Sequence, residues 1–184
     1  MADWDTRYRE GVHSGTGPHE LVARFQAAIP HGTVIDIAAG RGRDILFLAG
    51  LGYRACGLER SAEALKIMGD DARSREQRLL LVQGDASSLP FRKGSASGVI
   101  VFYFLLRDIM GQLVDLLEKG GILIYETYLK RQNMLGRGMN PAYLLEDGEL
   151  LSCFRDLELL FYEEIVISGE GKARALARYV GRKR

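Results

Sequence analysis

Short apolar runs alternate with amphipathic stretches along most of this 184-residue chain. The apolar runs are typical of strands buried on both faces of a sheet, and the amphipathic stretches have the spacing of helices that cover it. This alternation predicts an α/β fold on a mainly parallel sheet. The predicted strands are residues 34–37, 53–58, 79–83, 99–104 and 122–125. The predicted helices are residues 19–29, 44–51, a stretch that follows the N-cap Ser61, a stretch that ends at Lys119, and residues 145–154.

The last part of the chain follows a different pattern. Residues 157–167 and 173–180 alternate apolar and polar side chains around a glycine-rich segment at 168–171. This alternation predicts a pair of antiparallel strands at the end of the chain.

Residues 126–143 follow neither the helical nor the strand period. A loop of this length inside a compact domain is usually functional, so we expect it on the substrate side. Its Lys130, Arg131 and Arg137 could attract an anion. The sequence is equally consistent with a solvated, charged loop.

A glycine-rich turn joins the strand at 34–37 to the helix that begins near Asp44. Gly40 and Gly42 allow a sharp turn and a close approach of a ligand to the backbone, with helix amides facing that ligand. The next strand ends at Glu59, seventeen residues after Gly42, where a carboxylate can accept hydrogen bonds from both ribose hydroxyls. The turn therefore predicts a nucleoside site, and the alternative is a plain turn followed by a surface glutamate.

The spacing of the turn disfavours two kinds of nucleotide. A dinucleotide fingerprint needs a third glycine at the position of Ile45, and the chain has no phosphate-binding motif of the form G-x-x-x-x-G-K-[ST]. Asp36 lies four residues before Gly40, where a carboxylate could serve a cationic ligand directly or through water.

These motifs resemble those of the class I S-adenosylmethionine-dependent methyltransferases. Residues 36–42 are similar to the D-x-G-x-G-x-G motif, with Ala38 in place of the first glycine, and Glu59 matches the second, acidic motif. Residues 84–86 and 89–91 resemble G-D-A and L-P-F, and residues 117–124 resemble L-x-P-G-G-x-L-x-I with Lys119 in place of proline. The resemblance spans roughly Trp4 to Val180.

Within that superfamily, the chain is most similar to small bacterial methyltransferases of the tellurite-resistance (TehB-type) and thiopurine-methyltransferase-like group. Residues 4–8, 40–44, 124–127 and 140–145 carry this narrower likeness. The resemblance implies a doubly wound, seven-stranded, mostly parallel sheet with an antiparallel last strand, and S-adenosyl-L-methionine as the cofactor. The cofactor-binding residues that it implies are Asp36, Ala38, Gly40, Arg41, Gly42, Glu59, Arg60, Asp85, Ala86 and Phe102.

The resemblance also assigns roles to individual segments. Asp85 would accept from the adenine amino group, unless it only forms an Asx turn. Residues 102–106 replace the N-P-P-Y box of many nitrogen methyltransferases, which argues against DNA-amine methylation and suggests an apolar wall beside the methyl group. Residues 1–18 would form a lid over the cofactor or a loose surface arm.

The implied function is methyl transfer to a small molecule, with a soft sulfur, selenium or tellurium atom as one acceptor; the alternative is a non-catalytic cofactor-binding module. A soft, ionised acceptor needs no general base, whereas a hydroxyl acceptor does. The sequence identifies no catalytic residue, and we expect His13 and His19 to be structural or exposed.

Composition argues against several other classes of function. With 47% apolar residues and a net charge of +1, the chain is expected to be one domain, residues 1–184, without a nucleic-acid-binding field. It has no long apolar run or signal pattern, so we expect a cytoplasmic protein with a small-molecule substrate and no membrane partner. Cys56 and Cys153 predict packing rather than a disulfide or a metal site. The oligomeric state is left open.

Overall fold

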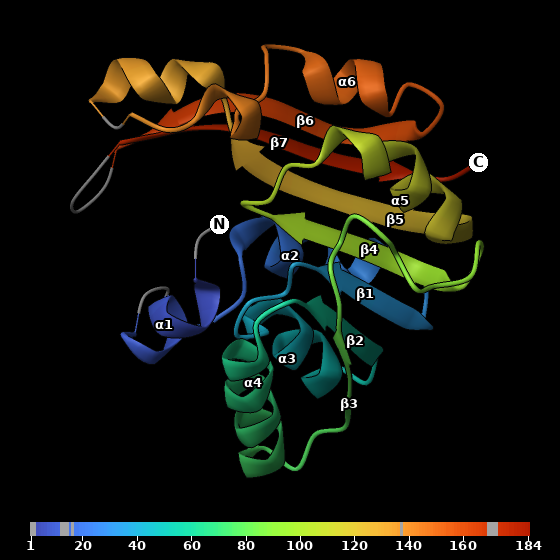
Figure 1. The fold of residues 1–184 in the computed structure, drawn as a ribbon. Helices are drawn as coiled ribbons and strands as arrows, with labels where there is room; N and C mark the ends of the chain where they lie inside the picture. The colour runs from blue at the N-terminus through green and yellow to red at the C-terminus, as the bar shows by residue number, and fades with distance from the viewer. Residues whose placement is uncertain (1–2, 12–14, 16, 137, 169–172) are drawn as a thin grey trace.

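A seven-stranded sheet forms the centre of the computed structural model, which describes residues 3–11, 15, 17–136, 138–168 and 173–184 (Figure 1). The strand order is β3-β2-β1-β4-β5-β7-β6. Strands β1 to β5 are parallel to one another, and β7 is antiparallel to both of its neighbours. The predicted doubly wound sheet with a reversed last strand is therefore confirmed. The strands are β1 (Thr33–Ile37), β2 (Arg54–Glu59), β3 (Leu79–Gln83), β4 (Ala96–Phe102), β5 (Leu117–Tyr128), β6 (Glu158–Ile167) and β7 (Arg174–Arg182).

Helices cover both faces of this sheet, because successive strand residues point to opposite sides. Ile35 belongs to a core cluster that includes buried residues of α5 and α6 on one face, while Val34 belongs to a second cluster with residues of α2, α3 and α4 on the other. The α-helices are α1 (Trp4–Arg9), α2 (Glu20–Phe25), α3 (Arg43–Gly50), α4 (Ala62–Ser74), α5 (Met110–Leu116) and α6 (Glu149–Cys153). The 3-10 helices are η1 (Gln26–Ala28), η2 (Arg107–Ile109), η3 (Lys130–Leu135) and η4 (Pro141–Tyr143).

Several element boundaries differ from those predicted. The helix predicted over residues 145–154 begins only at Glu149, and two further differences have clear causes. The helix predicted to reach Lys119 ends at Leu116, because Leu117 already has extended backbone dihedrals and pairs with Ala96. Gly120, with φ +81°, lies within β5 rather than at a helix end. At the other boundary, β4 ends at Phe102, two residues earlier than predicted, because Tyr103 turns out of the strand with φ +53°.

The segment 126–143, predicted as one irregular loop, contains regular structure. Its first three residues complete β5, and most of the rest forms η3 and η4. Pairing with β7 extends β5 in this way, because Tyr128 lies opposite Leu176. A sequence window confined to this segment cannot show such a partner.

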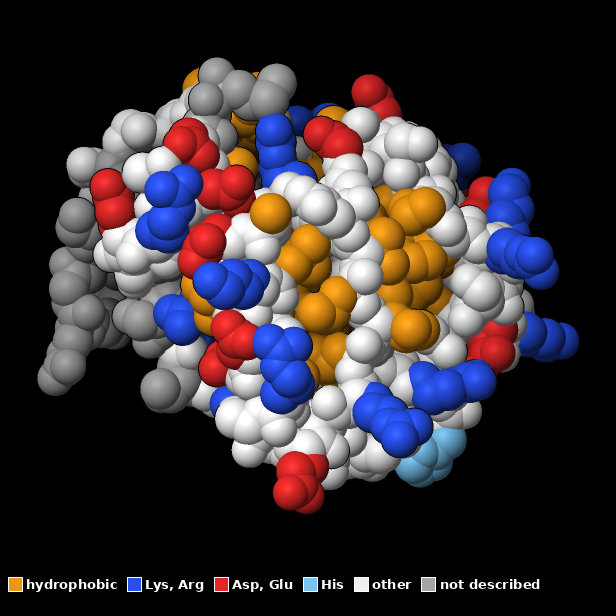
Figure 2. Space-filling model, turned by 60° about the horizontal axis from the view of Figure 1, so that its bottom comes forward, with side chains coloured by type: hydrophobic (Ala, Val, Ile, Leu, Met, Phe, Trp, Pro, Cys, Tyr) orange, Lys and Arg blue, Asp and Glu red, His pale blue; other side chains and the backbone are white. Residues whose placement is uncertain are grey.

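One edge of the sheet is only partly covered. The chain passes from β3 to β4 without an intervening helix, and Leu80 of edge strand β3 is 63% exposed. Figure 2, with the bottom of Figure 1 turned forward, shows apolar side chains gathered between charged ones on this face. Among the residues that the structure describes, no helix is long and apolar enough to cross a membrane.

Candidate cofactor and acceptor site

A crevice for a ligand is expected where the order of parallel strands reverses, beyond their carboxyl ends. In this sheet the reversal lies between β1 and β4, because the chain goes outward from β1 to β2 and β3 and then returns to β4 on the other side of β1. The predicted glycine turn follows β1 at this point, and Phe102 ends β4 beside it. The structure thus brings the predicted turn and Phe102 to one edge.

The turn after β1 is held in a backbone conformation that favours glycine. Gly40 and Gly42 have φ of +56° and +74°, and Ala38, at the position where the resembling motif has glycine, has φ +58°. A Cβ on Gly42 would lie 2.4 Å from Met68 Cγ, so this position has no room for a side chain. The unfavourable conformation of Ala38, a residue with a Cβ, is strain of the kind that concentrates at binding sites.

Glu59 lies at the end of β2, as predicted, but its carboxylate also binds the backbone. Its Oε2 accepts from the amide of Gly40 at 2.9 Å, and its Oε1 accepts from the amide of Ser61 at 2.9 Å. The side chain is buried, with the residue 5% exposed. Each carboxylate oxygen has a second acceptor position, so ribose hydroxyls can still bind there. Glu59 therefore links the glycine turn to the start of α4.

Asp36 is a buried carboxyl group without a hydrogen bond to any described residue. It is 4% exposed at the end of β1. Burial raises its pKa well above the ordinary value, and the nearby charges of Asp44 and Glu59 raise it further. A buried acid that lacks partners is costly to the protein. A cationic ligand beside it would favour its charged form.

The N-terminal helix α1 lies against this site, beside α4 (Figure 1). Asp5 accepts from the Ser61 hydroxyl at 2.5 Å and from the Glu63 amide at 3.3 Å. Tyr8 is buried, and its hydroxyl lies 2.9 Å from the point where a Cβ on Gly40 would stand. Burial, followed by the charge of Glu59, raises the pKa of the Tyr8 phenol. Helix α1 is thus docked on the glycine turn.

The third predicted acidic residue, Asp85, has a different environment. It is exposed and accepts from the amide of Ser87 at 2.9 Å, the Asx turn that was the alternative prediction. The hydrogen bonds from Ser87 lower the pKa of Asp85. Ala86 is buried and packs in the core beside it. Both follow β3, on the same side of the sheet as the glycine turn.

Comparison with known proteins identifies this architecture. Residues 34–121, which include the glycine turn, Glu59 and Asp85, match the family described as a methyltransferase domain. The chain has the class I methyltransferase fold. No curated protein matches its sequence.

Solved structures of several methyltransferases resemble this chain. TehB from Haemophilus influenzae has a TM-score of 0.80 at 17% identity, over 97% of this chain and 66% of that one. A SAM-dependent methyltransferase from Methanosarcina mazei has a TM-score of 0.73 at 17% identity, over 91% and 99%. Geranyl diphosphate C-methyltransferase from Streptomyces coelicolor A3(2), in complex with S-adenosyl-L-homocysteine, has a TM-score of 0.69 at 14% identity, over 89% and 78%. At these identities the likeness concerns the fold.

The side of the candidate site beyond Phe102 contains a polar network that the sequence did not predict. The Tyr103 hydroxyl donates to Glu126 Oε1 at 2.8 Å and accepts from Arg174 at 3.1 Å. Arg178 donates to Glu126 Oε2 at 2.9 Å and to Glu20 at 2.8 Å. Burial, followed by the charge of Glu126, raises the pKa of Tyr103. The surface after β4, expected to be apolar, therefore also contains polar side chains that hydrogen bonds hold in place.

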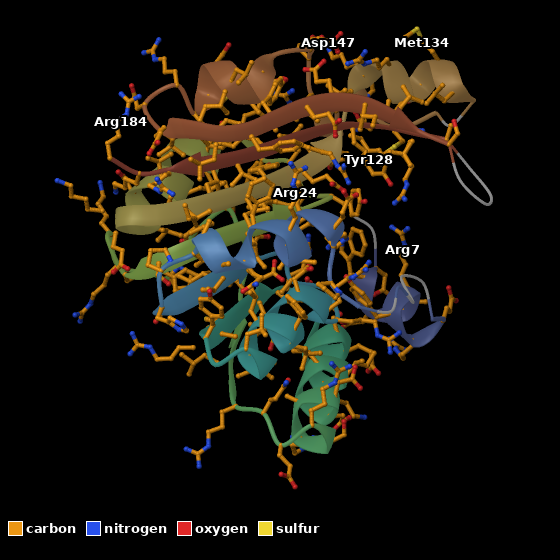
Figure 3. All side chains as sticks on the ribbon, turned by 180° about the vertical axis from the view of Figure 1, so that it is seen from behind. Arg7, Arg24, Tyr128, Met134, Asp147 and Arg184 are labelled. Carbon is orange, nitrogen blue, oxygen red and sulfur yellow. The ribbon has the colours of Figure 1, made fainter. Side chains whose placement is uncertain are left out.

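The sequence could not predict this network because its members come from distant parts of the chain; Glu20 and Arg178 are 158 positions apart. The one local signal was Glu126, a charged residue that directly follows the apolar run at residues 122–125. Tyr103 also packs on Tyr128, with ring centroids 5.2 Å apart. Figure 3 shows Tyr128 on the same side of the molecule as Arg7 of α1. The end of β5 and the N-terminal helix thus flank the same edge of the sheet.

The predicted anion-attracting side chains are engaged elsewhere. Lys130 pairs with Glu146, and Arg131 pairs with Glu164 and Asp147. Arg137 lies outside the described residues, as does His13. For Lys130 and Arg131, the structure favours the alternative of a charged surface segment held by ion pairs.

Proposed function

We propose that this enzyme transfers a methyl group from S-adenosylmethionine to a small-molecule acceptor bound beside Phe102. The observation that carries the proposal is the buried carboxyl of Asp36, which has no hydrogen-bond partner among the described residues and lies beside the positive-φ turn at the strand reversal. The proposed cofactor-binding residues are Asp36, Ala38, Gly40, Arg41, Gly42, Glu59, Arg60, Asp85, Ala86 and Phe102.

The residues present fit a cofactor that carries a sulfonium cation and a ribose. A cation bound beside Asp36 would favour its charged form, and the attraction between the two is strong in a setting of low polarity. Glu59 offers two unused acceptor positions to ribose hydroxyls. Gly40 keeps the space over the turn free of a side chain, and only the phenol of Tyr8 comes near it.

A bound sulfonium supplies an electrophilic methyl group, so the protein's part is to align the acceptor and exclude water. Alignment means holding the nucleophilic atom at about 3 Å from the methyl carbon in a desolvated site. Phe102, which is 9% exposed, provides an apolar surface for this. The likeness to TehB-type proteins favours a soft sulfur, selenium or tellurium acceptor within the small-molecule class.

The N-terminal arm, residues 3–11, is proposed to act as a lid. Tyr8 over Gly40 and Asp5 on the start of α4 support this, since both contacts lie at the rim of the proposed cofactor site. Closure excludes water before transfer. Hydrogen exchange of the arm should slow when S-adenosylhomocysteine binds, and Tyr8→Ala should reduce that protection. Equal exchange with and without the ligand would identify the arm as surface packing.

Calorimetry and a turnover assay together test the function. S-adenosylmethionine should bind to the wild-type protein and to Asp108→Asn, an exposed acidic control, and bind more weakly to Asp36→Asn. Turnover to S-adenosylhomocysteine should then appear with one member of a screen of tellurite, selenite, thiols and thiopurines. Binding without turnover across the screen would favour the rival function, a cofactor-binding sensor or scaffold. Absence of binding would reject the cofactor site.

A further inference from the structure

A histidine lies at the strand reversal, where it contacts the residues that end β4 and the start of α3. His19, which precedes α2, stacks flat on Phe102 with ring centroids 4.0 Å apart and an interplanar angle of 4°. Its ring also meets the edge of Tyr103 at 5.4 Å. On the other side, its Nδ1 lies 2.6 Å from Asp44 Oδ2, in the first turn of α3. The imidazole therefore joins the two elements that flank the strand reversal.

Asp44 determines which ring nitrogen of His19 carries the proton. A carboxylate accepts hydrogen bonds, so the short contact assigns the proton of the neutral ring to Nδ1 and leaves a lone pair on Nε2. Nε2 has no hydrogen-bond partner among the described residues. The side chain is 14% exposed, so the ring is largely desolvated but can be reached.

Anchoring of α2 does not account for this arrangement. The backbone amide of His19 already donates to Asp44 Oδ1 at 2.7 Å, and that bond holds the start of α2 without any imidazole. The second oxygen of Asp44 is used to fix the orientation of the ring. Phe102 and Tyr103 then limit the ring from its face and its edge.

We propose that His19 Nε2 accepts the proton of methyl acceptors that arrive protonated, such as thiols, and that Asp44 positions it. This inference rests on the proposed function. The proton of the acceptor moves to Nε2, and the freed electron pair forms the bond to the methyl carbon. The pair of the broken carbon–sulfur bond remains on the sulfur of S-adenosylhomocysteine, and the imidazolium then returns its proton to solvent. The enzyme would therefore also serve acceptors that are not ionised in solution.

His19→Asn is the matched variant, because the asparagine amide can still donate to Asp44 while Nε2 is removed. His31→Asn is the control, since His31 is exposed and stacks on Tyr53, away from the crevice. Each protein is assayed with an alkyl thiol, which is mostly protonated at pH 7 because a thiol pKa is about 8.5. Each is also assayed with a nitrothiophenol, which is ionised at that pH.

Removal of a general base should slow only the reaction that needs one. His19→Asn should lose about 10²–10⁴-fold in kcat with the alkyl thiol and change by less than about threefold with the nitrothiophenol. Equal losses on both acceptors, or none on either, would overturn the role of His19. If the wild-type protein methylates neither acceptor nor any member of the screen, the proposed function itself fails.

Nitrogen-15 NMR of the ligand-free protein provides a readout independent of activity. The chain has three histidines, and His19→Asn assigns the resonances of His19. At alkaline pH, the spectrum should show a protonated Nδ1 and an unprotonated Nε2, and Asp44→Asn should shift the ring toward the other tautomer. A protonated Nε2 in the wild-type protein would overturn the inference, because that nitrogen could not accept a proton.

Discussion

Glu59 is the residue whose loss should affect stability and binding together. Its carboxylate accepts from the amides of Gly40 and Ser61, both at 2.9 Å, in a site where Glu59 is 5% exposed. Glu59→Ala would leave both amide donors without their partner. The residue therefore contributes to the shape of the glycine turn before any ligand binds.

The size of this effect follows from the two hydrogen bonds. A hydrogen bond to a charged group contributes about 1.5–3 kcal/mol, so two of them give about 3–6 kcal/mol. Since a small domain is stable by about 5–15 kcal/mol, the variant should still fold. For a chain of this length, each kcal/mol shifts Tm by about 2–4 °C, which predicts a fall of about 6–24 °C. Loss of the ribose contacts should weaken S-adenosylhomocysteine binding by a further 1–3 kcal/mol or so.

Thermal unfolding monitored by circular dichroism measures the first effect, and calorimetry below the transition measures the second. Glu63→Ala is the matched control, because its carboxylate makes no hydrogen bond with the described residues and it lies nearby, in the first turn of α4. Glu59→Gln should be intermediate, since its amide offers one acceptor to two donors. If Glu59→Ala unfolds at the temperature of Glu63→Ala, the two hydrogen bonds do not stabilise the turn. Unchanged affinity would remove Glu59 from the cofactor site.

Three further variants test other parts of the site. Gly40→Val should abolish S-adenosylhomocysteine binding by calorimetry while circular dichroism shows a folded protein, because φ +56° and the nearby phenol leave no room for a branched side chain; normal binding would refute the site. Asp36 has a raised pKa, so its contribution to stability is present at low pH and lost as pH rises through that pKa. Asp36→Asn should therefore unfold at a higher temperature than wild type at pH 8 and at a similar temperature at pH 4. Each tenfold difference in proton affinity between the folded and unfolded chain corresponds to about 1.4 kcal/mol of stability. Arg178→Met should cost about 3–5 kcal/mol in urea unfolding by leaving the buried Glu126 carboxylate without its ion-pair partner, against about 0–1 kcal/mol for half-exposed Arg182→Met. Equal costs would show that the buried ion pair stabilises the fold no more than the exposed one.

The sequence predicted elements well where local pattern alone determines them. Strand β3 has the predicted bounds, Leu79–Gln83, and the Ser61 hydroxyl caps α4 as predicted by accepting from the amide of Ala64. The boundary at Leu117 was missed because Gly120 and Gly121 are typical of a helix end. In the structure, the backbone of Lys183 binds both glycines, and only the folded chain brings that residue near them.

In the candidate site, too, the sequence predicted the parts formed by local contacts and missed those formed by distant ones. The glycine turn and Glu59 lie within one strand–helix–strand unit, so their spacing was informative. His19, which precedes α2, and Asp44 of α3 are 25 residues apart, and neither residue type has a distinctive local pattern. Their contact exists because Leu21 of α2 and Ile45 of α3 pack in one core on the same face of the sheet.

Three unfavourable features of the molecule lie at this one edge of the sheet. Of the described non-glycine residues with positive φ, Ala38 and Tyr103 directly follow β1 and β4, the two strands at the reversal. Asp36, the buried acid, lies near the end of the same β1. Packing of the surrounding core holds all three in place, because none of them is stabilised by its own conformation or solvation. A cationic ligand near Asp36 would lower the free-energy cost of burying its carboxylate, and this gain would add to the binding energy. Substitutions at Asp36, Ala38 or Tyr103 that remove the unfavourable feature should therefore stabilise the protein and weaken ligand binding.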